Sequence, residues 1–336
     1  MAKGAVQPQP EALPEAQVQR FRTMLGKLVP TADRIGIAVS GGPDSLALLL
    51  LAAAARPGAV EAATVDHGLR EGSRDEAEMV AGLCRTIGVP HETLTIEWEE
   101  KPTTAIQERA RLRRYGALAE WARRQGLKTI LTGHHANDQA ETLLMRLRRG
   151  AGLSGLSGMR YAVRVPGSEE ALVRPLLGWS REELEQLCAG AGVTPALDPS
   201  NEDESFERVS IRKALAAADW LGPRAVAASA AHLAEADAAL TWAANREWRR
   251  AAKAANGMLI LDPAGLPREI VRRLLSRAIA GLASEGKGAA LRGRQSDRLM
   301  AALASGQKAT LRGVSCSGGK TWTFARAPAR KAKAQG

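Results

Sequence analysis

The chain has 336 residues and a mass of 35.7 kDa, and its 45% hydrophobic and 25% charged residues exclude intrinsic disorder as its main state. Its 47 lysines and arginines outnumber the 36 aspartates and glutamates, which gives a formal net charge of +11. No apolar run is long enough to cross a bilayer, no signal-peptide pattern is found, and three widely separated cysteines (Cys84, Cys188 and Cys316) have no metal-finger spacing. We therefore expect a cytoplasmic protein of about two domains that does not enter a membrane.

The first half of the chain alternates between apolar, strand-like runs and helical patterns. Residues 1–20 are predicted to form a flexible leader. The run 34–39 is rich in β-branched residues and predicts a buried strand, and residues 46–55 have a helical pattern. Further strands are expected at 59–65, 92–96 and 129–131, and further helices at 74–87 and 106–125. This order predicts an α/β fold, a doubly wound and mostly parallel sheet with helices on both faces.

The second half of the chain predicts a smaller, mainly helical domain. Helices are expected at 137–149, at 180–191, where Ser180 and Glu183 have the capping-box spacing, and through the alanine-rich stretch 223–256. Short strands are expected at 309–314 and 321–325, joined by a hairpin. We place a catalytic domain at 21–221, and a helical linker with a basic domain at 222–336.

Most of the net charge lies near the end of the sequence. From Lys287 onward there are eleven lysines and arginines against one acid, Asp297, which leaves the preceding residues at +1. A basic segment of this kind commonly meets a polyanion such as nucleic acid. Composition alone agrees equally well with a solvated tail.

The string 40–45, Ser-Gly-Gly-Pro-Asp-Ser, lies between the first strand and the first helix of the sheet. Two glycines let the backbone approach a ligand closely, and the amide groups at the start of the next helix favour phosphate. Asp44 adds a carboxylate that could hold Mg²⁺ against those phosphates. The alternative is a simple strand-to-helix turn. Gly319-Lys320-Thr321 resembles the end of a Walker A loop, but Val314 stands where that loop needs its first glycine.

Titratable residues cluster where the helix at 137–149 begins. His134, His135 and Asp138 could in principle ligate zinc, but we find no further ligand nearby. Asp138 and Glu141 are three residues apart and share a helix face, where they could cap the helix or bind a cation. Arginines at 146, 148, 149, 160 and 164 flank a glycine-rich link and predict contacts with RNA phosphates or a solvated helix face.

The string at 40–45 resembles the signature of the PP-loop, or N-type, ATP pyrophosphatases. The segment 133–150, GHHANDQAETLLMRLRRG, followed by 155–159 and 174–177, is similar to the tRNA(Ile)-lysidine synthetase family. The strings VDHGLR at 65–70, ARLRRY at 110–115 and DPSN at 198–201 add to this resemblance. The motifs run in the family's order over about residues 34–212.

The resemblance implies a two-step reaction on the wobble cytidine of an isoleucine tRNA with a CAU anticodon. ATP adenylates the C2 oxygen of the cytosine, and the side-chain amine of lysine then displaces AMP to form lysidine. The change would move codon specificity from AUG to AUA, and amino-acid identity from methionine to isoleucine. With this RNA substrate in mind, we interpret the basic segment after residue 286 as an RNA-docking surface.

The resemblance also implies roles for individual residues. ATP would bind to Ser40, Gly41, Gly42, Pro43, Asp44 and Ser45, with Mg²⁺ held through Asp44. Catalytic roles fall on Asp44, on Arg114 as a cation at the α-phosphate, and on His134 nearby. Asp138 and Glu141 would hold the ammonium group of lysine. Contacts with tRNA fall on Arg146, Arg148, Arg149, Arg208 and Arg212.

One motif departs from the family pattern, and three rival functions can be weighed. In the segment 206–212, Val209 and Ser210 replace an asparagine and an arginine, which puts any substrate contact of those two positions in question. A PP-loop tRNA thiolase would need cysteine pairs, and a PP-loop ligase of small metabolites would not need the basic segment. A non-catalytic nucleic-acid-binding protein would leave the string 40–45 without a purpose.

Overall fold

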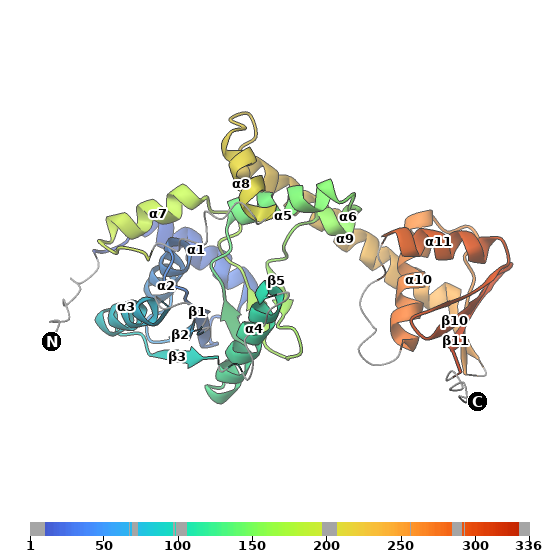
Figure 1. The fold of residues 1–336 in the computed structure, drawn as a ribbon, viewed down its shortest axis with the longest axis horizontal. Coiled ribbons are helices and arrows are strands. Elements are labelled where there is room, and N and C mark those ends of the chain that lie inside the picture. Colours follow the sequence, from blue (N-terminus) through green and yellow to red (C-terminus); the bar gives the residue numbers. More distant parts are fainter. Residues whose placement is uncertain are drawn as a thin grey trace, which may run out of the picture. The chain divides into compact units, whose positions relative to one another are not determined.

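The computed structural model describes residues 11–66, 68, 73–96, 98, 106–196, 207–255, 257–283, 291 and 293–328. Parts of four predicted features lie outside the described residues: the leader up to residue 10, the motif around His67, the motif 198–201 with Phe206, and residues 287–290, 292 and 329–336 of the basic segment. The chain divides into two compact units, residues 1–150 with 155–231 and residues 151–154 with 232–336 (Figure 1). The predicted boundary at 221 lies ten residues before this division, which falls inside a long helix.

The first unit is built on a six-stranded sheet with the strand order β3-β2-β1-β4-β6-β5. Its strands are β1 (Ile35–Ala38), β2 (Val60–Asp66), β3 (His91–Thr95), β4 (Thr129–Leu131), β5 (Ala162–Arg164) and β6 (Ala171–Val173). Neighbouring strands are parallel, except that β5 runs antiparallel to β6. The chain leaves β1 toward β2 on one side and reaches β4 on the other, and ligands of doubly wound folds bind at such a reversal. The predicted fold class is confirmed.

Helices cover both faces of this sheet. The helices of the first unit are α1 (Glu15–Leu28), α2 (Pro43–Ala55), α3 (Ser73–Thr86), α4 (Ile106–Arg124), α5 (Ala136–Arg148), α7 (Arg181–Gly190), α8 (Glu207–Ala216) and the first part of α9 (Pro223–Ala251), with α6 (Leu153–Leu156) at the division between the units. On one face, residues 46–52 of α2 are all buried, because this helix lies between the sheet and the helices α1 and α7. On the other face, α4 packs Leu118 and Trp121 against Ile130 and Leu172. None of the described helices is long and apolar enough to span a bilayer.

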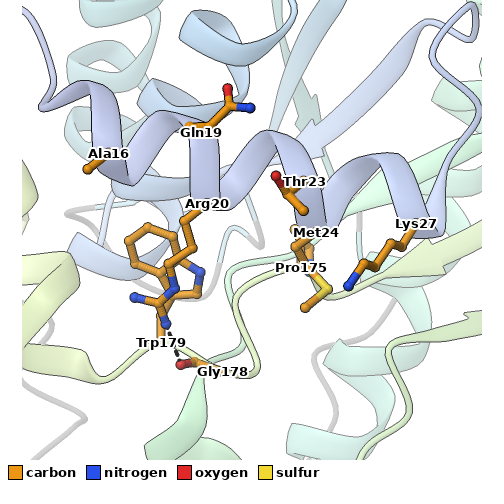
Figure 2. Close-up of a pocket in the computed structure, with 9 residues that line it drawn as sticks. All are labelled: Ala16, Gln19, Arg20, Thr23, Met24, Lys27, Pro175, Gly178 and Trp179. Atoms are coloured by element: carbon orange, nitrogen blue, oxygen red, sulfur yellow. Dashed lines mark hydrogen bonds between the residues drawn. The ribbon is translucent and has the colours of Figure 1, made fainter.

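Helix α1 begins inside the predicted leader. Val18 is buried in the core, so residues 15–20 are an integral part of the first unit. The Arg20 guanidinium stacks 4.1 Å from the Trp179 ring centroid and donates to the Gly178 carbonyl oxygen at 2.7 Å (Figure 2). These contacts fix α1 beside the segment that enters α7.

The second unit combines helices with a five-stranded antiparallel sheet, in the order β7-β8-β11-β10-β9. Its elements are the rest of α9, β7 (Ala252–Ala255), β8 (Met258–Leu261), α10 (Arg268–Leu282), α11 (Gly293–Ala304), β9 (Lys308–Leu311), β10 (Val314–Ser317) and β11 (Trp322–Arg326). Leu274, Leu303 and Phe324 lie in its core. Of its helices the sequence analysis placed only the alanine-rich one, predicted over 223–256, which ends at Ala251. The unit also contains a sheet of which the sequence indicated only two short strands.

The predicted strand 309–314 is in fact two strands joined by a tight turn. Arg312 and Gly313 have φ angles of 54° and 78°, which fit a two-residue hairpin loop between β9 and β10. The described part of the basic segment, residues 293–328, is therefore folded into α11 and β9–β11.

Candidate active site

A cavity of about 960 Å³ lies in the first unit, where the chain leaves the carboxyl ends of β1 and β4. Its lining includes Ser40, Gly42, Pro43, Asp44, Ser45, Arg111, Arg114, Thr132, Gly133, His134, His135, Asn137, Asp138, Glu141, Arg208 and Arg212. The reversal of strand order between β1 and β4 leaves this space open. The structure thus brings to one cavity the predicted catalytic and lysine-binding residues and all of the predicted ATP-binding residues except Gly41.

The loop 40–45 is held in shape by the side chain of Ser45. The Ser45 hydroxyl accepts a hydrogen bond from the Ser40 amide at 3.0 Å and donates one to the Gly42 carbonyl oxygen, also at 3.0 Å. Gly41 has a φ angle of 83°, in the region that favours glycine, and Pro43 is the first residue of α2. The first amides of a helix lack partners within the helix, so this loop has the properties of a phosphate-binding site.

Gly133 brings a second loop into contact with the first. A Cβ atom at this position would lie 2.8 Å from the backbone oxygen of Asp44, closer than real Cβ contacts allow. Glycine therefore permits the segment after β4 to pack directly on the backbone of the loop 40–45. The role of Gly133 escaped the sequence analysis, although the residue opens the motif 133–150.

Asp44 presents a carboxylate to the cavity. Its Oδ2 atom lies 3.4 Å from Nε2 of His135, and its Oδ1 atom is buried without a hydrogen-bond partner in the described part of the chain. A buried carboxylate oxygen without a partner is costly unless a cation or donor meets it. The residue therefore fits the predicted role of a magnesium ligand beside bound phosphates.

His135 links the loop to α5. Its Nδ1 atom accepts a hydrogen bond from the Asn137 amide at 3.2 Å, and the Asp138 carboxylate accepts one from the His135 amide at 3.1 Å, which completes a capping box. Nε2 lies close to both Asp44 and Asp138. Burial lowers the pKa of His135, but the hydrogen bond to Asp44 and the nearby carboxylates outweigh it and raise that pKa above 6.5. The sequence analysis considered His135 only as a zinc ligand.

His134 is a neutral imidazole at physiological pH. Burial, strengthened by the positive charges of Arg174 and Arg114, lowers its pKa to about 3. Its Nδ1 atom lies 2.9 Å from the Thr132 hydroxyl, which orients the ring. The described residues contain no group of three histidine, cysteine or acidic side chains that could hold a metal ion, so the zinc alternative gains no support.

Helix α4 supplies two arginines to the cavity. Arg111 and Arg114 lie 5.0 and 5.4 Å from the Tyr115 ring centroid, and both guanidinium groups line the cavity. Nε of Arg114 is buried without a partner among the described residues. Arg111 was not singled out in the sequence, although its spacing of three residues from Arg114 places it on the same helix face.

The predicted lysine-binding carboxylates meet two arginines that were predicted to bind tRNA. Glu141 is buried, and its two carboxylate oxygens lie 2.6 Å from Nε of Arg208 and 2.8 Å from Nε of Arg212. Asp138 Oδ1 lies 3.1 Å from the same Arg208. Burial raises the pKa of Asp138, but the charges of His135 and Arg208 outweigh it and keep that pKa below 3.8. Helix α8 thus balances the charge of the acidic pair.

The arginines at the end of α5 divide into two kinds. Arg146 donates to the carbonyl oxygens of Gly155 and Gly158 at 2.8 and 2.9 Å, so it holds the glycine-rich link in place. Arg148 and Arg149 are exposed, and both pair with Glu207 of α8.

The departure from the family pattern falls on α8. Val209 is buried and Ser210 is exposed on this helix. An apolar side chain at 209 therefore suits its surroundings.

Comparisons with known proteins identify the class. Residues 14–218 match the model of the PP-loop domain family. Together with the parallel sheet and the loop 40–45, this match defines the chain as a PP-loop protein. A U34-tRNA thiolase, NcsA from Methanococcus maripaludis, shares the fold with a TM-score of 0.54 and 15% sequence identity over 65% of this chain and 77% of that chain.

Curated relatives narrow the class to one family. The chain is 50% identical to the tRNA(Ile)-lysidine synthase of Novosphingobium aromaticivorans over 311 residues, which cover 92% of this chain and 93% of that protein. It is 41% identical to the enzyme of the same name from Zymomonas mobilis over 304 residues, or 90% of this chain and 91% of that protein. The chain therefore belongs to the tRNA(Ile)-lysidine synthase family, and the resemblance found in its motifs is confirmed.

Proposed function

We propose that this chain ligates lysine to the wobble cytidine of the isoleucine tRNA that carries a CAU anticodon. The observation that carries the proposal is the 50% identity to a curated tRNA(Ile)-lysidine synthase over 92% of the chain. The cavity supports it, because a phosphate loop with Asp44 and a buried acidic pair, Asp138 and Glu141, line the same space. The product would read AUA rather than AUG, and the tRNA would change its identity from methionine to isoleucine.

The first step adenylates the cytosine. Its C2 oxygen attacks the α-phosphate of ATP, the bond between the α- and β-phosphates breaks, and pyrophosphate leaves. Arg114 is a permanently charged donor suited to negative charge that develops at the α-phosphate, and neutral His134 can donate a hydrogen bond there without adding charge. Asp44 would hold Mg²⁺, which offsets the charge of the phosphates when it is bound.

The second step forms the bond to lysine. The side-chain amine attacks C2, and the bond from C2 to the oxygen of the adenylate breaks as AMP leaves. The amine must lose a proton before it attacks, and a carboxylate of Asp138 or Glu141 can accept that proton. Arg208 and Arg212 contact these carboxylates, so an incoming lysine must share or replace their hydrogen bonds.

The three cysteines do not favour sulfur transfer as the activity. Cys84, Cys188 and Cys316 are all buried, and burial raises the pKa of the first two thiols to about 12 and of the third to about 11. Thiols of this kind are poor nucleophiles and poor metal ligands. We also propose the cytoplasm as the site of action, where its tRNA, lysine and ATP are present.

The test is incubation of the protein with ATP, Mg²⁺, labelled lysine and a transcript of the isoleucine tRNA. We expect label to enter the RNA with release of AMP, and the same transcript with uridine at the wobble position to remain unlabelled. A protein that cleaves ATP and never transfers lysine to the cytidine transcript would contradict the proposal.

A further inference from the structure

A basic and aromatic surface lies on the part of α9 that belongs to the second unit. Trp242 is 66% exposed, and Asn245, Arg246 and Arg249 follow at intervals of three or four residues on the same helix face. Arg277 of α10 joins them, because its guanidinium donates to the Asn245 side-chain oxygen at 2.7 Å. We call these five residues the α9 surface.

The cations of the α9 surface carry uncompensated charge. Among the described residues, Arg246 and Arg249 form no ion pair, and Arg277 contacts the neutral Asn245 amide and the Trp248 ring, at 4.5 Å, but no acid. Other arginines nearby differ in this respect. Arg250 pairs with Glu247, and partly buried Arg273 pairs with Asp237 and Glu269. Three cations on one face with no acid beside them in the described part of the chain favour an anionic partner.

The described residues of the second unit leave Trp242 largely exposed. Its ring centroid lies 5.9 Å from the Arg246 guanidinium, and a cation–π contact at an exposed site is weak. Burial of a large aromatic side chain stabilises a protein more than such a contact does. An aromatic ring held in solvent among arginines has the chemistry of surfaces that bind nucleic acid, in which cations meet phosphates and rings stack on bases.

We propose that the α9 surface binds the substrate RNA, with Arg246, Arg249 and Arg277 on backbone phosphates and Trp242 stacked on an unpaired base. The proposal rests on the proposed function, because that function supplies the RNA. It adds a surface that the sequence analysis did not name. That analysis placed an RNA-docking surface after residue 286 and further tRNA contacts on Arg146, Arg148, Arg149, Arg208 and Arg212. The α9 surface lies before that segment, in a region whose net charge gives no signal.

The experiment measures binding of the isoleucine tRNA transcript by the full-length protein at several salt concentrations. The double variant R246A/R249A should weaken binding and reduce the slope of log K against log salt concentration by about 2, since each phosphate contact contributes about 0.9. W242A should lower affinity about 5- to 100-fold without changing the slope, and W242F should restore most of it. R250A is the matched control, because Arg250 lies on the same helix but pairs with Glu247. Its affinity for tRNA and its salt slope should both stay close to the wild-type values.

A second measurement separates this proposal from the proposed function. In lysine ligation the α9 variants should raise the KM for tRNA far more than they lower kcat, because the cavity lies in the first unit. Wild-type affinity and slope in both W242A and R246A/R249A would overturn the proposal that the α9 surface binds RNA. An acidic protein would then be the expected partner of this surface, and the proposed function would still stand. A wild-type chain that binds no tRNA would overturn both.

Discussion

Asp44 and Ser45 are adjacent residues of one loop with different roles. Ser45 is buried, and its hydroxyl group forms hydrogen bonds with the backbone of the loop. Asp44, in contrast, has one buried carboxylate oxygen without a hydrogen-bond partner among the described residues. Ser45 therefore shapes the site, and Asp44 provides its charge.

The variant D44N tests the charge of this carboxylate. The amide has the same shape and can still contact His135, but it lacks the negative charge that would hold Mg²⁺ at the phosphates. We expect adenylation of the tRNA to fall at least 100-fold, since electrostatic interactions of this kind contribute several kcal/mol to catalysis. The rate of pyrophosphate release checks this, with thermal unfolding as the control for folding. An adenylation rate above a tenth of the wild-type rate would contradict the assignment.

His134 should make the protein sensitive to acid. Its folded pKa of about 3 lies below the unfolded value of 6.5, so below pH 6.5 the unfolded chain gains a proton that the folded chain refuses. Its contribution to the free energy of unfolding is therefore present above pH 6.5 and falls as the pH drops, by about 2 kcal/mol at pH 5. Urea unfolding of the wild type and of H134N at pH 7.5 and pH 5 measures it. If the free energy of unfolding falls equally in both proteins between pH 7.5 and pH 5, His134 is not the cause of the acid sensitivity.

The sequence indicated these residues better than it indicated their contacts. The strings at 40–45 and 133–150 led to Asp44, His134, Asp138 and Glu141, and the structure brings all four to one cavity. The sequence could not show that Arg208 of α8, almost 70 residues farther along the chain, pairs with Glu141. Such a pairing depends on how elements pack, and the spacing of residues carries no signal for it.

At the scale of elements, the site depends on the close approach of two loops. The segment that joins β4 to α5 rests on the backbone of the loop before α2, and His135 caps α5 while it contacts Asp44. Displacement of either loop therefore changes both the phosphate site and the acidic pair.

The variant G133A should separate these loops. A Cβ atom at this position would meet the Asp44 backbone at 2.8 Å, and overpacking of this kind typically costs about 1–3 kcal/mol. We expect a lower melting temperature and weaker ATP binding. G116A is the matched control, because nothing lies within 4 Å of a Cβ there and Gly116 is inside α4, where alanine should stabilise the helix slightly. Wild-type ATP affinity in G133A would contradict the account of the two loops.

Elements with strong periodicity were predicted well, and short ones were not. The strand β1 and the helices α2, α4 and α5 have clear patterns, whereas β5 and β6 have three residues each and depend on their neighbours. The segment Ala252–Ala255 has a helical composition but forms β7, paired with β8. The Asn256-Gly257 dipeptide between them is a strong hairpin signal that the alanine-rich context obscured.

At the scale of the whole molecule, chemistry and charge are distributed over two units. The cavity belongs to the first unit, and the α9 surface and the basic segment belong to the second. Removal of the basic segment would also delete α11 and β9–β11, which carry core residues such as Leu303 and Phe324. Point substitutions on folded elements are therefore the appropriate test of RNA binding.

The proposed function assigns two chemical steps to one cavity, with different residues for each step. Adenylated RNA and lysine-bearing RNA can be followed together in a single turnover of the wild type, D44N and E141Q. We predict that D44N forms neither species, and that E141Q forms adenylated RNA at a near wild-type rate but passes it to lysine at least tenfold more slowly. Equal loss of both steps in E141Q, or lysine transfer by D44N at the wild-type rate, would contradict this account.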